Sequence, residues 1–209
     1  MGSSTALLLA DLVGVAVFAA SGGSAAVAKR LDIFGVVFVG VAAALGGGIF
    51  RDLVIGVVPP LAFADWRYPA TAAVTSFAVF WLHPRLARIR RTVLVLDAAG
   101  LALFTVTGTL TALRAGVPAV GAGIIGMITG IGGGLLRDLL TAQIPTVLHR
   151  EVYALASLLG AVAVVVLFRA GVAQFWPLFG AALLVFGVRL IALLRRWTPP
   201  AARLDSGEA

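Results

Sequence analysis

The 209 residues are 61% hydrophobic and only 12% charged, with a mean hydropathy of +1.08. This small number of charged residues cannot cover a water-soluble core of this size. The composition therefore excludes a soluble globular protein and indicates an integral membrane protein. Lys and Arg (16) outnumber Asp and Glu (9), but they lie singly or in short clusters between apolar runs, which argues against nucleic-acid binding.

Seven apolar runs approach or exceed the roughly 20 residues that a helix needs to cross the hydrocarbon core. In chain order they are residues 6–28, 33–57, 69–84, 93–113, 118–142, 152–169 and 175–194. The first run contains Asp11 and follows no basic region, so we interpret it as a retained helix and not as a cleaved signal peptide. The third run is short enough for a re-entrant segment, although Trp66, Tyr68 and Trp81 would suit the membrane interfaces.

The charges of the loops predict the orientation of these spans. If all seven runs cross, one face carries most of the basic residues: Lys29, Arg30, Arg85, Arg88, Arg90, Arg91 and Arg150, with Arg195, Arg196 and Arg203 of the tail. The opposite face receives Arg67, Arg114 and Arg169. The positive-inside rule then places the C-terminus, with a short tail at 197–209, in the cytoplasm and the N-terminus outside.

The sequence repeats itself at an offset of 86 residues without a gap. The matched pairs are Asp11 and Asp97, Gly14 and Gly100, Phe18 and Phe104, Gly22 and Gly108, GGGIFRD (46–52) and GGGLLRD (132–138), and Pro59 and Pro145. Each copy holds three spans, an odd number, so the second copy must enter the bilayer from the opposite face. The predicted fold is therefore one all-α integral membrane domain over residues 1–196, with inverted repeats at about 6–84 and 92–170 and a seventh helix at about 174–195.

Three consecutive glycines stand in the second and in the fifth span: Gly46, Gly47 and Gly48, and Gly132, Gly133 and Gly134. Each glycine weakens a helix by about 1 kcal/mol relative to alanine, so these triplets predict a kink or a break. Carbonyl groups freed at membrane depth would need a water-filled cavity, where they could replace part of a cation's hydration shell. The alternative is that the glycines only permit tight helix packing.

An Arg-Asp pair follows each triplet: Arg51 with Asp52, and Arg137 with Asp138. Ionised residues within spans usually face a cavity or one another, so the pairs of the two repeats are predicted to meet, Arg51 with Asp138 and Arg137 with Asp52. In that arrangement they would line or gate a path. The alternative is a purely structural role as ion pairs.

Further polar residues are candidates for a pathway. Asp11 and Asp97 lie near the starts of their spans, where a carboxylate suits the helix dipole, which slightly favours a structural role. The hydroxyl residues Ser21, Thr105, Thr107 and Thr109 would line a wet path, bond across helices or bond to their own helices. GAGIIG at 121–126 matches a nucleotide-binding glycine pattern, but it lies inside an apolar span with no strand before it, so we expect no nucleotide.

Enzymatic and metal chemistry find little support. The sequence has no cysteine, and neither His83 nor His149 lies near another plausible ligand, so we expect no metal site and no cofactor. No nucleophile and base stand out as a pair, so we expect no enzyme.

The doubled GGGxxRD pattern, set in the middle span of each three-helix repeat with a seventh helix appended, resembles the prokaryotic trimeric intracellular cation channels over nearly the whole chain. The resemblance implies a lipid-embedded homotrimer in a bacterial or archaeal cell membrane, with no evident soluble partner. It implies a pore in each protomer, bounded by second and fifth helices kinked at the six glycines and passing K⁺ and, less selectively, Na⁺. Animal members carry a Lys-Glu-Val motif linked to phosphoinositide binding, which this chain lacks, since its one lysine is Lys29.

Two functions therefore remain open. The first is a passive cation channel, in which carbonyls, Asp side chains and hydroxyls stabilise partly hydrated K⁺ while Arg51 and Arg137 tune its passage. The second is a secondary transporter of a small zwitterion such as glycine, a label that related bacterial sequences have also received. In that reading Arg51 or Arg137 binds the carboxylate, and Asp52 or Asp138 binds the ammonium group.

Overall fold

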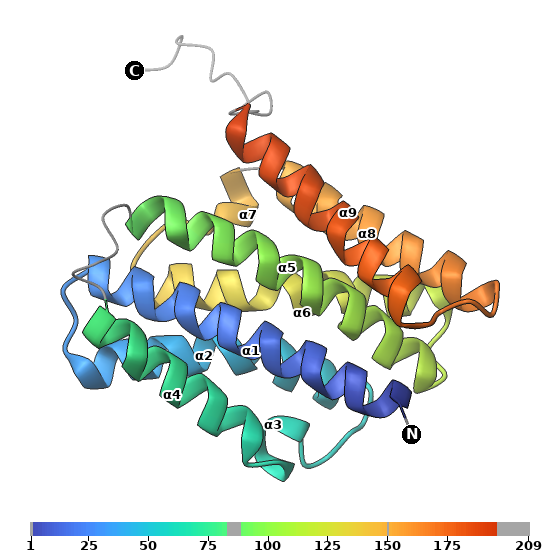
Figure 1. The fold of residues 1–209 in the computed structure, drawn as a ribbon, viewed down its shortest axis with the longest axis horizontal. Coiled ribbons are helices and arrows are strands. Elements are labelled where there is room, and N and C mark those ends of the chain that lie inside the picture. The colour runs from blue at the N-terminus through green and yellow to red at the C-terminus, as the bar shows by residue number, and fades with distance from the viewer. Residues whose placement is uncertain (1, 83–88, 150, 196–209) are drawn as a thin grey trace, which may run out of the picture.

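The computed structural model describes the backbone of residues 2–82, 89–149 and 151–195, which form one bundle of helices (Figure 1). The helices are α1 (Gly2–Ala28), α2 (Ile33–Val54), α3 (Leu61–Ala64), α4 (Arg67–Leu82), α5 (Ile89–Arg114), α6 (Ala119–Leu140), α7 (Thr146–His149), α8 (Glu151–Arg169) and α9 (Phe175–Leu194). The predicted tail and His83, Arg85, Arg88, Arg150, Arg196 and Arg203 lie outside the described residues, as do the side chains of Arg90, Arg91 and His149.

Six helices are long and apolar enough to cross a membrane, and each corresponds to a predicted span. They are α1, α2, α5, α6, α8 and α9, which confirms an all-helical, multi-pass membrane protein. The third predicted span corresponds to α4, which has 16 residues. At 1.5 Å per residue α4 is about 24 Å long, which is less than the roughly 30 Å of the hydrocarbon core, so a crossing by α4 stays a prediction.

The helix order of the first half returns in the second half. α1, α2 and α4 pack against one another, and the short α3 lies between α2 and α4 in the chain. α5, α6 and α8 pack in the same combinations, with the short α7 between α6 and α8. The halves meet where α1 packs on α5 and α2 on α6, and α9 packs on α5 and α8 (Figure 1).

A reciprocal contact between α1 and α5 lies at the centre of the bundle. A Cβ added at Gly14 would collide with the ring of Phe104, and one added at Gly100 would collide with the ring of Phe18. The two rings are buried, with their centroids 5.3 Å apart. Each half therefore contributes one ring and one small residue that makes room for the ring of the other half.

Several helix ends are fixed by local hydrogen bonds. Asp32 caps the start of α2 by accepting a hydrogen bond from the backbone N–H of Gly35 at 2.8 Å. Gly56 and Gly116 follow the ends of α2 and α5 with φ of 78° and 83°, a conformation that glycine adopts without a steric penalty.

The predicted break at the glycine triplets is absent, because both α2 and α6 continue as α-helix through their three glycines. The close packing of the two helices gives the reason. A Cβ at Gly47 would collide with the Thr129 carbonyl oxygen, and one at Gly133 would collide with the Ala43 carbonyl oxygen. The backbones thus touch at these glycines, which is the packing role that the sequence left open.

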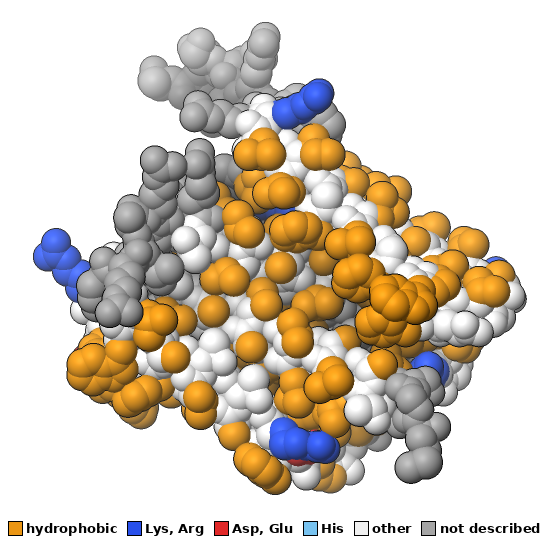
Figure 2. Space-filling model, in the orientation of Figure 1, with side chains coloured by type: hydrophobic (Ala, Val, Ile, Leu, Met, Phe, Trp, Pro, Cys, Tyr) orange, Lys and Arg blue, Asp and Glu red, His pale blue; other side chains and the backbone are white. Residues whose placement is uncertain are grey.

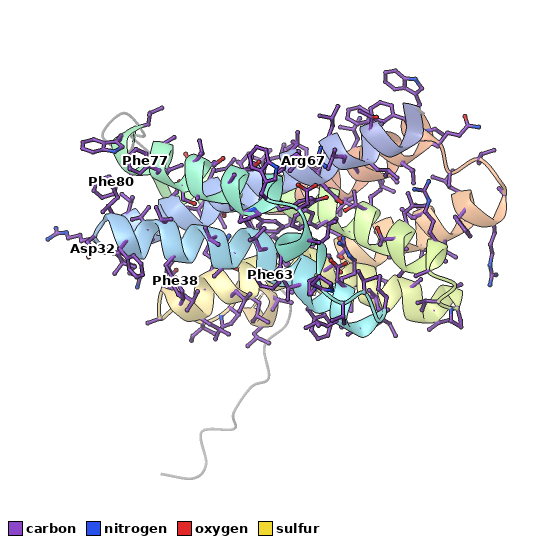
Figure 3. All side chains as sticks on the ribbon, turned by 90° about the horizontal axis from the view of Figure 1, so that it is seen from below. Asp32, Phe38, Phe63, Arg67, Phe77 and Phe80 are labelled. Carbon is purple, nitrogen blue, oxygen red and sulfur yellow. The ribbon has the colours of Figure 1, made fainter. Side chains whose placement is uncertain are left out.

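The outside of the bundle is apolar, as expected of a surface that faces lipid. Hydrophobic side chains are spread over the whole face seen in Figure 2, where charged side chains are few. Phe38, Phe63 and Phe77 lie on the outside of the bundle (Figure 3), each at least half exposed. Trp66 and Trp176, at the starts of α4 and α9, are 76% and 75% exposed, in keeping with aromatic anchors at a membrane interface.

Candidate functional site

The two Arg-Asp pairs form buried ion pairs near the ends of α2 and α6. Arg51 Nε and Arg137 Nε each donate to Oδ1 of the following aspartate at 2.8 Å. All four residues are at most 5% exposed. Each arginine therefore pairs within its own half.

The predicted pairing across the repeats is wrong, and the packing of α2 on α6 explains why. Ala43 lies against Gly133 and Gly47 against Thr129, so residue numbers rise along one helix as they fall along the other. The helices are therefore antiparallel at their crossing. Arg51 and Arg137 lie beyond the crossing in opposite directions and cannot reach each other's aspartates.

The second oxygen of each aspartate fixes the loop that follows the helix. Asp52 Oδ2 accepts a hydrogen bond at 2.9 Å from the N–H of Leu61, the first residue of α3. Asp138 Oδ2 accepts from the N–H of Thr146, the first residue of α7, at 2.8 Å and from its hydroxyl at 3.0 Å. These bonds connect each ion pair to the loop and short helix that lead into α4 or α8.

The second half builds a closed cluster around Arg137. Arg137 Nη1 donates to Asp97 Oδ1 at 2.7 Å and to the Ser21 hydroxyl, from the first half, also at 2.7 Å. The Tyr153 hydroxyl donates to the same Asp97 oxygen at 3.2 Å. The Arg189 guanidinium of α9 lies over the Tyr153 ring, 4.7 Å from its centroid. Asp97 Oδ2 has no hydrogen-bond partner among the described residues, but the rest of the cluster is tightly joined.

The first half carries the same residue types in a looser cluster. The Tyr68 hydroxyl lies 3.4 Å from Asp11 Oδ2, a long hydrogen bond. Within the described chain no ion pair joins Arg51 to Asp11. Asp11 Oδ1 and the Thr107 hydroxyl, which lies beside this carboxylate, are both enclosed and lack a hydrogen-bond partner in the described part of the protein.

A small cavity lies between Asp11, Arg51 and Tyr68 of the first cluster. Its volume is about 20 Å³, and its polar lining comes from Asp11, Arg51, Asp52, Tyr68 and Thr129. This is room for one water-sized particle. The first cluster is thus an open version of the closed second cluster.

The interpretation of Asp11 and Asp97 as helix-dipole residues is wrong. α1 begins at Gly2 and α5 begins at Ile89, so both carboxylates lie two turns or more inside their helices. The dipole effect is confined to the first turn of a helix. The longer helices move both aspartates into the two polar clusters.

The predicted hydroxyls divide into two groups. Thr105 bonds to Ser157 of α8 at 2.7 Å, and Thr109 donates to the carbonyl of Thr105 at 2.7 Å, so both serve helix contacts. Ser21 and Thr107, which the 86-residue offset matches, instead lie at the second and first clusters. Each half therefore sends one hydroxyl to the cluster of the other half.

Tyr68, Tyr153 and Arg189 belong to the clusters, which the sequence did not predict. Tyr68 was expected at a membrane interface, but it is buried, with its hydroxyl turned to Asp11. A signal existed for Arg189, a charged residue within the last apolar run. The tyrosines were harder to find because Tyr153 lies one residue short of the position 86 residues after Tyr68.

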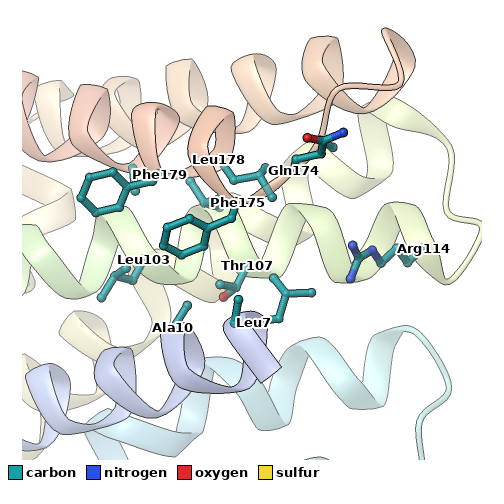
Figure 4. A pocket seen from close by; sticks show the side chains of 13 residues that line it. Leu7, Ala10, Leu103, Thr107, Arg114, Gln174, Phe175, Leu178 and Phe179 are labelled. Carbon is teal, nitrogen blue, oxygen red and sulfur yellow. The ribbon is translucent and has the colours of Figure 1, made fainter. Parts of the chain in front are cut away.

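A larger groove, of about 290 Å³, lies between α1, α5 and α9. Figure 4 shows Phe175 and Leu178 of α9 opposite Leu7 of α1, with Thr107 of α5 between them and Arg114 at one end. Its lining is almost entirely apolar. We therefore place the polar site at the two clusters and not in this groove.

Comparison with known proteins agrees with this architecture. A family model described as "Glycine transporter" matches residues 8–84 and 94–169, two segments whose starts are separated by the same 86 residues as the internal repeat. A "UPF0126 membrane protein" of Deinococcus radiodurans is 41% identical over 189 residues, which are 90% of this chain and 87% of the relative. The "UPF0126 inner membrane protein YadS" of Escherichia coli K12 is 40% identical over 153 residues, 73% of this chain and 74% of the relative.

Solved structures show the same fold. A crystal structure described as the TRIC trimeric intracellular cation channel orthologue from Rhodobacter sphaeroides has a TM-score of 0.89 and 35% identity, covering 92% of this chain and 100% of that one. A structure reported as a basis for conductance through TRIC cation channels has a TM-score of 0.85 and 31% identity, covering 95% and 98%.

The six apolar helices, the buried charges and the similarity to these relatives together define a multi-pass membrane protein. One of the relatives is described as a bacterial inner membrane protein. The chain belongs to the UPF0126 family, the prokaryotic relatives of the TRIC cation channels.

Proposed function

We propose that this protein is a K⁺-permeable cation channel that works as a homotrimer with one pore in each protomer. The observation that carries the proposal is the first cluster, where the enclosed Asp11 carboxylate borders a cavity lined mainly by α1 and α2. A buried carboxylate beside a water-sized cavity attracts cations and repels anions. The likeness to the Rhodobacter sphaeroides TRIC channel orthologue, at 35% identity over 92% of this chain, supports the same function.

The proposed topology has seven spans, with α4 as the third, and two repeats that enter the bilayer from opposite faces. The N-terminus lies outside and the C-terminus in the cytoplasm, as the distribution of Lys and Arg favours. The matched helix order of the halves and the two segments matched by the family model support the inverted repeat.

In this proposal α2 and α6 bend at their glycine triplets and keep their helical hydrogen bonds. The bend would bring Gly48 and the Asp11 cavity to one side of the crossing and Gly134 with Asp97 to the other. Arg51 and Arg137 would limit how many cations occupy the path, because each already neutralises one carboxylate.

A secondary transporter of glycine is the second candidate, favoured by the description of the matching family model. Arg51 would bind the substrate carboxylate, and Asp11 or Asp52 the ammonium group. The cavity at the first cluster, about 20 Å³, is smaller than a glycine molecule, so this function requires a wider conformation.

Recording from the purified full chain in a planar bilayer tests the proposal. A channel gives ohmic unitary currents in KCl without any organic solute. A carrier gives saturable, glycine-dependent uptake into liposomes and no unitary steps, and that result would overturn the channel proposal. Native mass spectrometry of the same preparation measures the oligomeric state, for which we expect three chains.

A further inference from the structure

The two clusters differ in how tightly their side chains close on the glycine beneath them. A Cβ added at Gly134 would lie 2.7 Å from Asp97 Oδ1 and 2.8 Å from the Tyr153 hydroxyl, so the closed cluster rests directly on this glycine. A Cβ at the matched Gly48 would meet no atom within 4 Å. The space over Gly48 is part of the cavity bordered by Asp11 and Tyr68.

The clusters also differ in charge. The first cluster sets two carboxylates, Asp11 and Asp52, against one guanidinium, Arg51, which leaves one net negative charge. The nearby Arg67 does not balance it, because Arg67 already forms an exposed ion pair with Asp65.

The second cluster has a second cation beside it, on α9. Asp97 and Asp138 face Arg137, and Arg189 lies over the tyrosine that donates to Asp97. α9 follows the second repeat and has no counterpart in the first. The first cluster therefore keeps the space that the second cluster has lost, and Arg51 is the cation that lines it.

From this difference we infer that the cavity bordered by Asp11, Arg51 and Tyr68 is a binding site for one dehydrated or nearly dehydrated monovalent cation, and that the second cluster binds none. The inference rests on the proposed function, since it names where a permeating ion would pause. Asp11 Oδ1, which has no hydrogen-bond partner in the described chain, and the Tyr68 hydroxyl, which borders the same cavity, supply oxygen ligands. Oxygen ligands of this kind suit alkali cations.

Charge favours a cation over a water molecule in this space. A buried net charge inside a membrane span is strongly unfavourable, and a neutral water molecule leaves it uncompensated. A monovalent cation in the cavity would compensate the charge of the first cluster. A proton on Asp11 would also neutralise the charge, so the experiment must separate the two.

Thallium(I) is a suitable probe, because it replaces K⁺ in many sites and scatters anomalously. Crystals of the full chain grown with a thallium salt should show an anomalous peak beside Asp11 and none beside Asp97. In detergent, unfolding should occur at a higher temperature in KCl than in N-methyl-D-glucamine chloride of equal ionic strength. A cavity without a peak, together with no K⁺-specific rise in Tm, would overturn the inference in favour of water or a protonated Asp11.

Two variants of the cavity sharpen the test. Asp11→Asn keeps the shape of the side chain but removes its charge, and should weaken Tl⁺ binding by roughly tenfold or more, because it removes a buried contact to a charged group. Gly48→Ala fills part of the cavity without any collision in the folded chain and should also abolish the K⁺-specific rise in Tm. Because Gly48→Ala retains every charge, loss of the rise in both variants assigns the effect to the cavity. An unchanged rise in both would contradict the inference.

The binding site and the channel function can fail separately. Ohmic currents without a thallium peak would leave the channel standing and remove the binding site. A peak at Asp11 without K⁺ currents would keep the binding site and remove the channel function, as for a carrier coupled to a cation.

Discussion

The clusters of the first and second halves are built from the same residue types, yet one is open and the other closed. In the second half Arg137 reaches across to Asp97 at 2.7 Å, whereas in the first half Arg51 holds only Asp52. The charged residues match at the 86-residue offset, so they alone do not account for the difference. Their surroundings differ: Ser21 accepts from Arg137 whereas its counterpart Thr107 does not bond to Arg51, and Arg189 of α9 lies over Tyr153. Duplication thus supplies matched groups, and the unmatched surroundings decide how each is used.

The largest expected difference between the halves concerns the two aspartates. Asp97→Asn should destabilise the fold by about 3 kcal/mol, the low end for breaking a buried ion pair, because Asp138 still holds Arg137. Asp11→Asn should change stability much less, because Asp11 forms no ion pair in the described chain. Thermal unfolding in detergent with N-methyl-D-glucamine as the cation compares them. Equal losses would show that the first cluster is also closed.

The crossing of α2 and α6 should be equally sensitive in both halves. Gly47→Ala and Gly133→Ala each push a Cβ into a backbone carbonyl that cannot turn away, so each should cost about 2 kcal/mol. Gly180→Ala on α9 is the matched control, because its Cβ meets no atom within 4 Å. The unfolding midpoints of the three variants give the comparison, and a stable Gly47→Ala variant would contradict the close crossing.

The glycines beneath the clusters should respond differently from each other. Gly134→Ala displaces Asp97 or Tyr153 and should cost about 1 to 2 kcal/mol. Gly48→Ala meets no atom and should be neutral or slightly stabilising, since alanine favours a helix over glycine by up to about 1 kcal/mol. Both are measured by unfolding in the absence of K⁺. The opposite order would reverse the assignment of open and closed clusters.

The tyrosine hydroxyls should show a smaller difference of the same kind. Tyr153→Phe removes a fully buried hydrogen bond to a charged group and should cost about 1.5 kcal/mol. Tyr68→Phe removes a longer bond, 3.4 Å, and should cost about a third as much. The unfolding midpoint of each variant, compared with the wild type, checks the ratio.

The smallest expected effect lies outside the membrane spans. The Arg67 side chain donates to Asp65 and lowers the pKa of that carboxyl, so the bond stabilises the fold above the ordinary carboxyl pKa and is lost as the pH falls through the lowered value. Both groups are exposed, so the effect should be barely measurable. Arg67→Gln should remove whatever acid dependence the pair causes in the unfolding midpoint, and leave the midpoint at neutral pH nearly unchanged.

Much of the fold could be predicted from the apolar runs and the internal repeat. The length of a span and the 86-residue offset between the repeats can both be measured along the sequence alone. The repeat also identified Asp11, Asp97, Arg51 and Arg137 as one matched set. Their partners did not follow, because pairing depends on the antiparallel crossing at Gly47 and Gly133, which spacing along the chain does not reveal. The continuous helices were missed for a related reason: glycine weakens an isolated helix, but here the neighbouring helix compensates by packing on its exposed backbone.

The exchange of Phe18 and Phe104 between the halves has a mechanical consequence. Each ring sits in a notch that the other half provides at Gly14 or Gly100, so sliding one half along the other would unseat both rings at once. Rotation about this contact keeps both rings seated. The contact is therefore suited to serve as a pivot, about which a movement that opened one face of the protein would close the other.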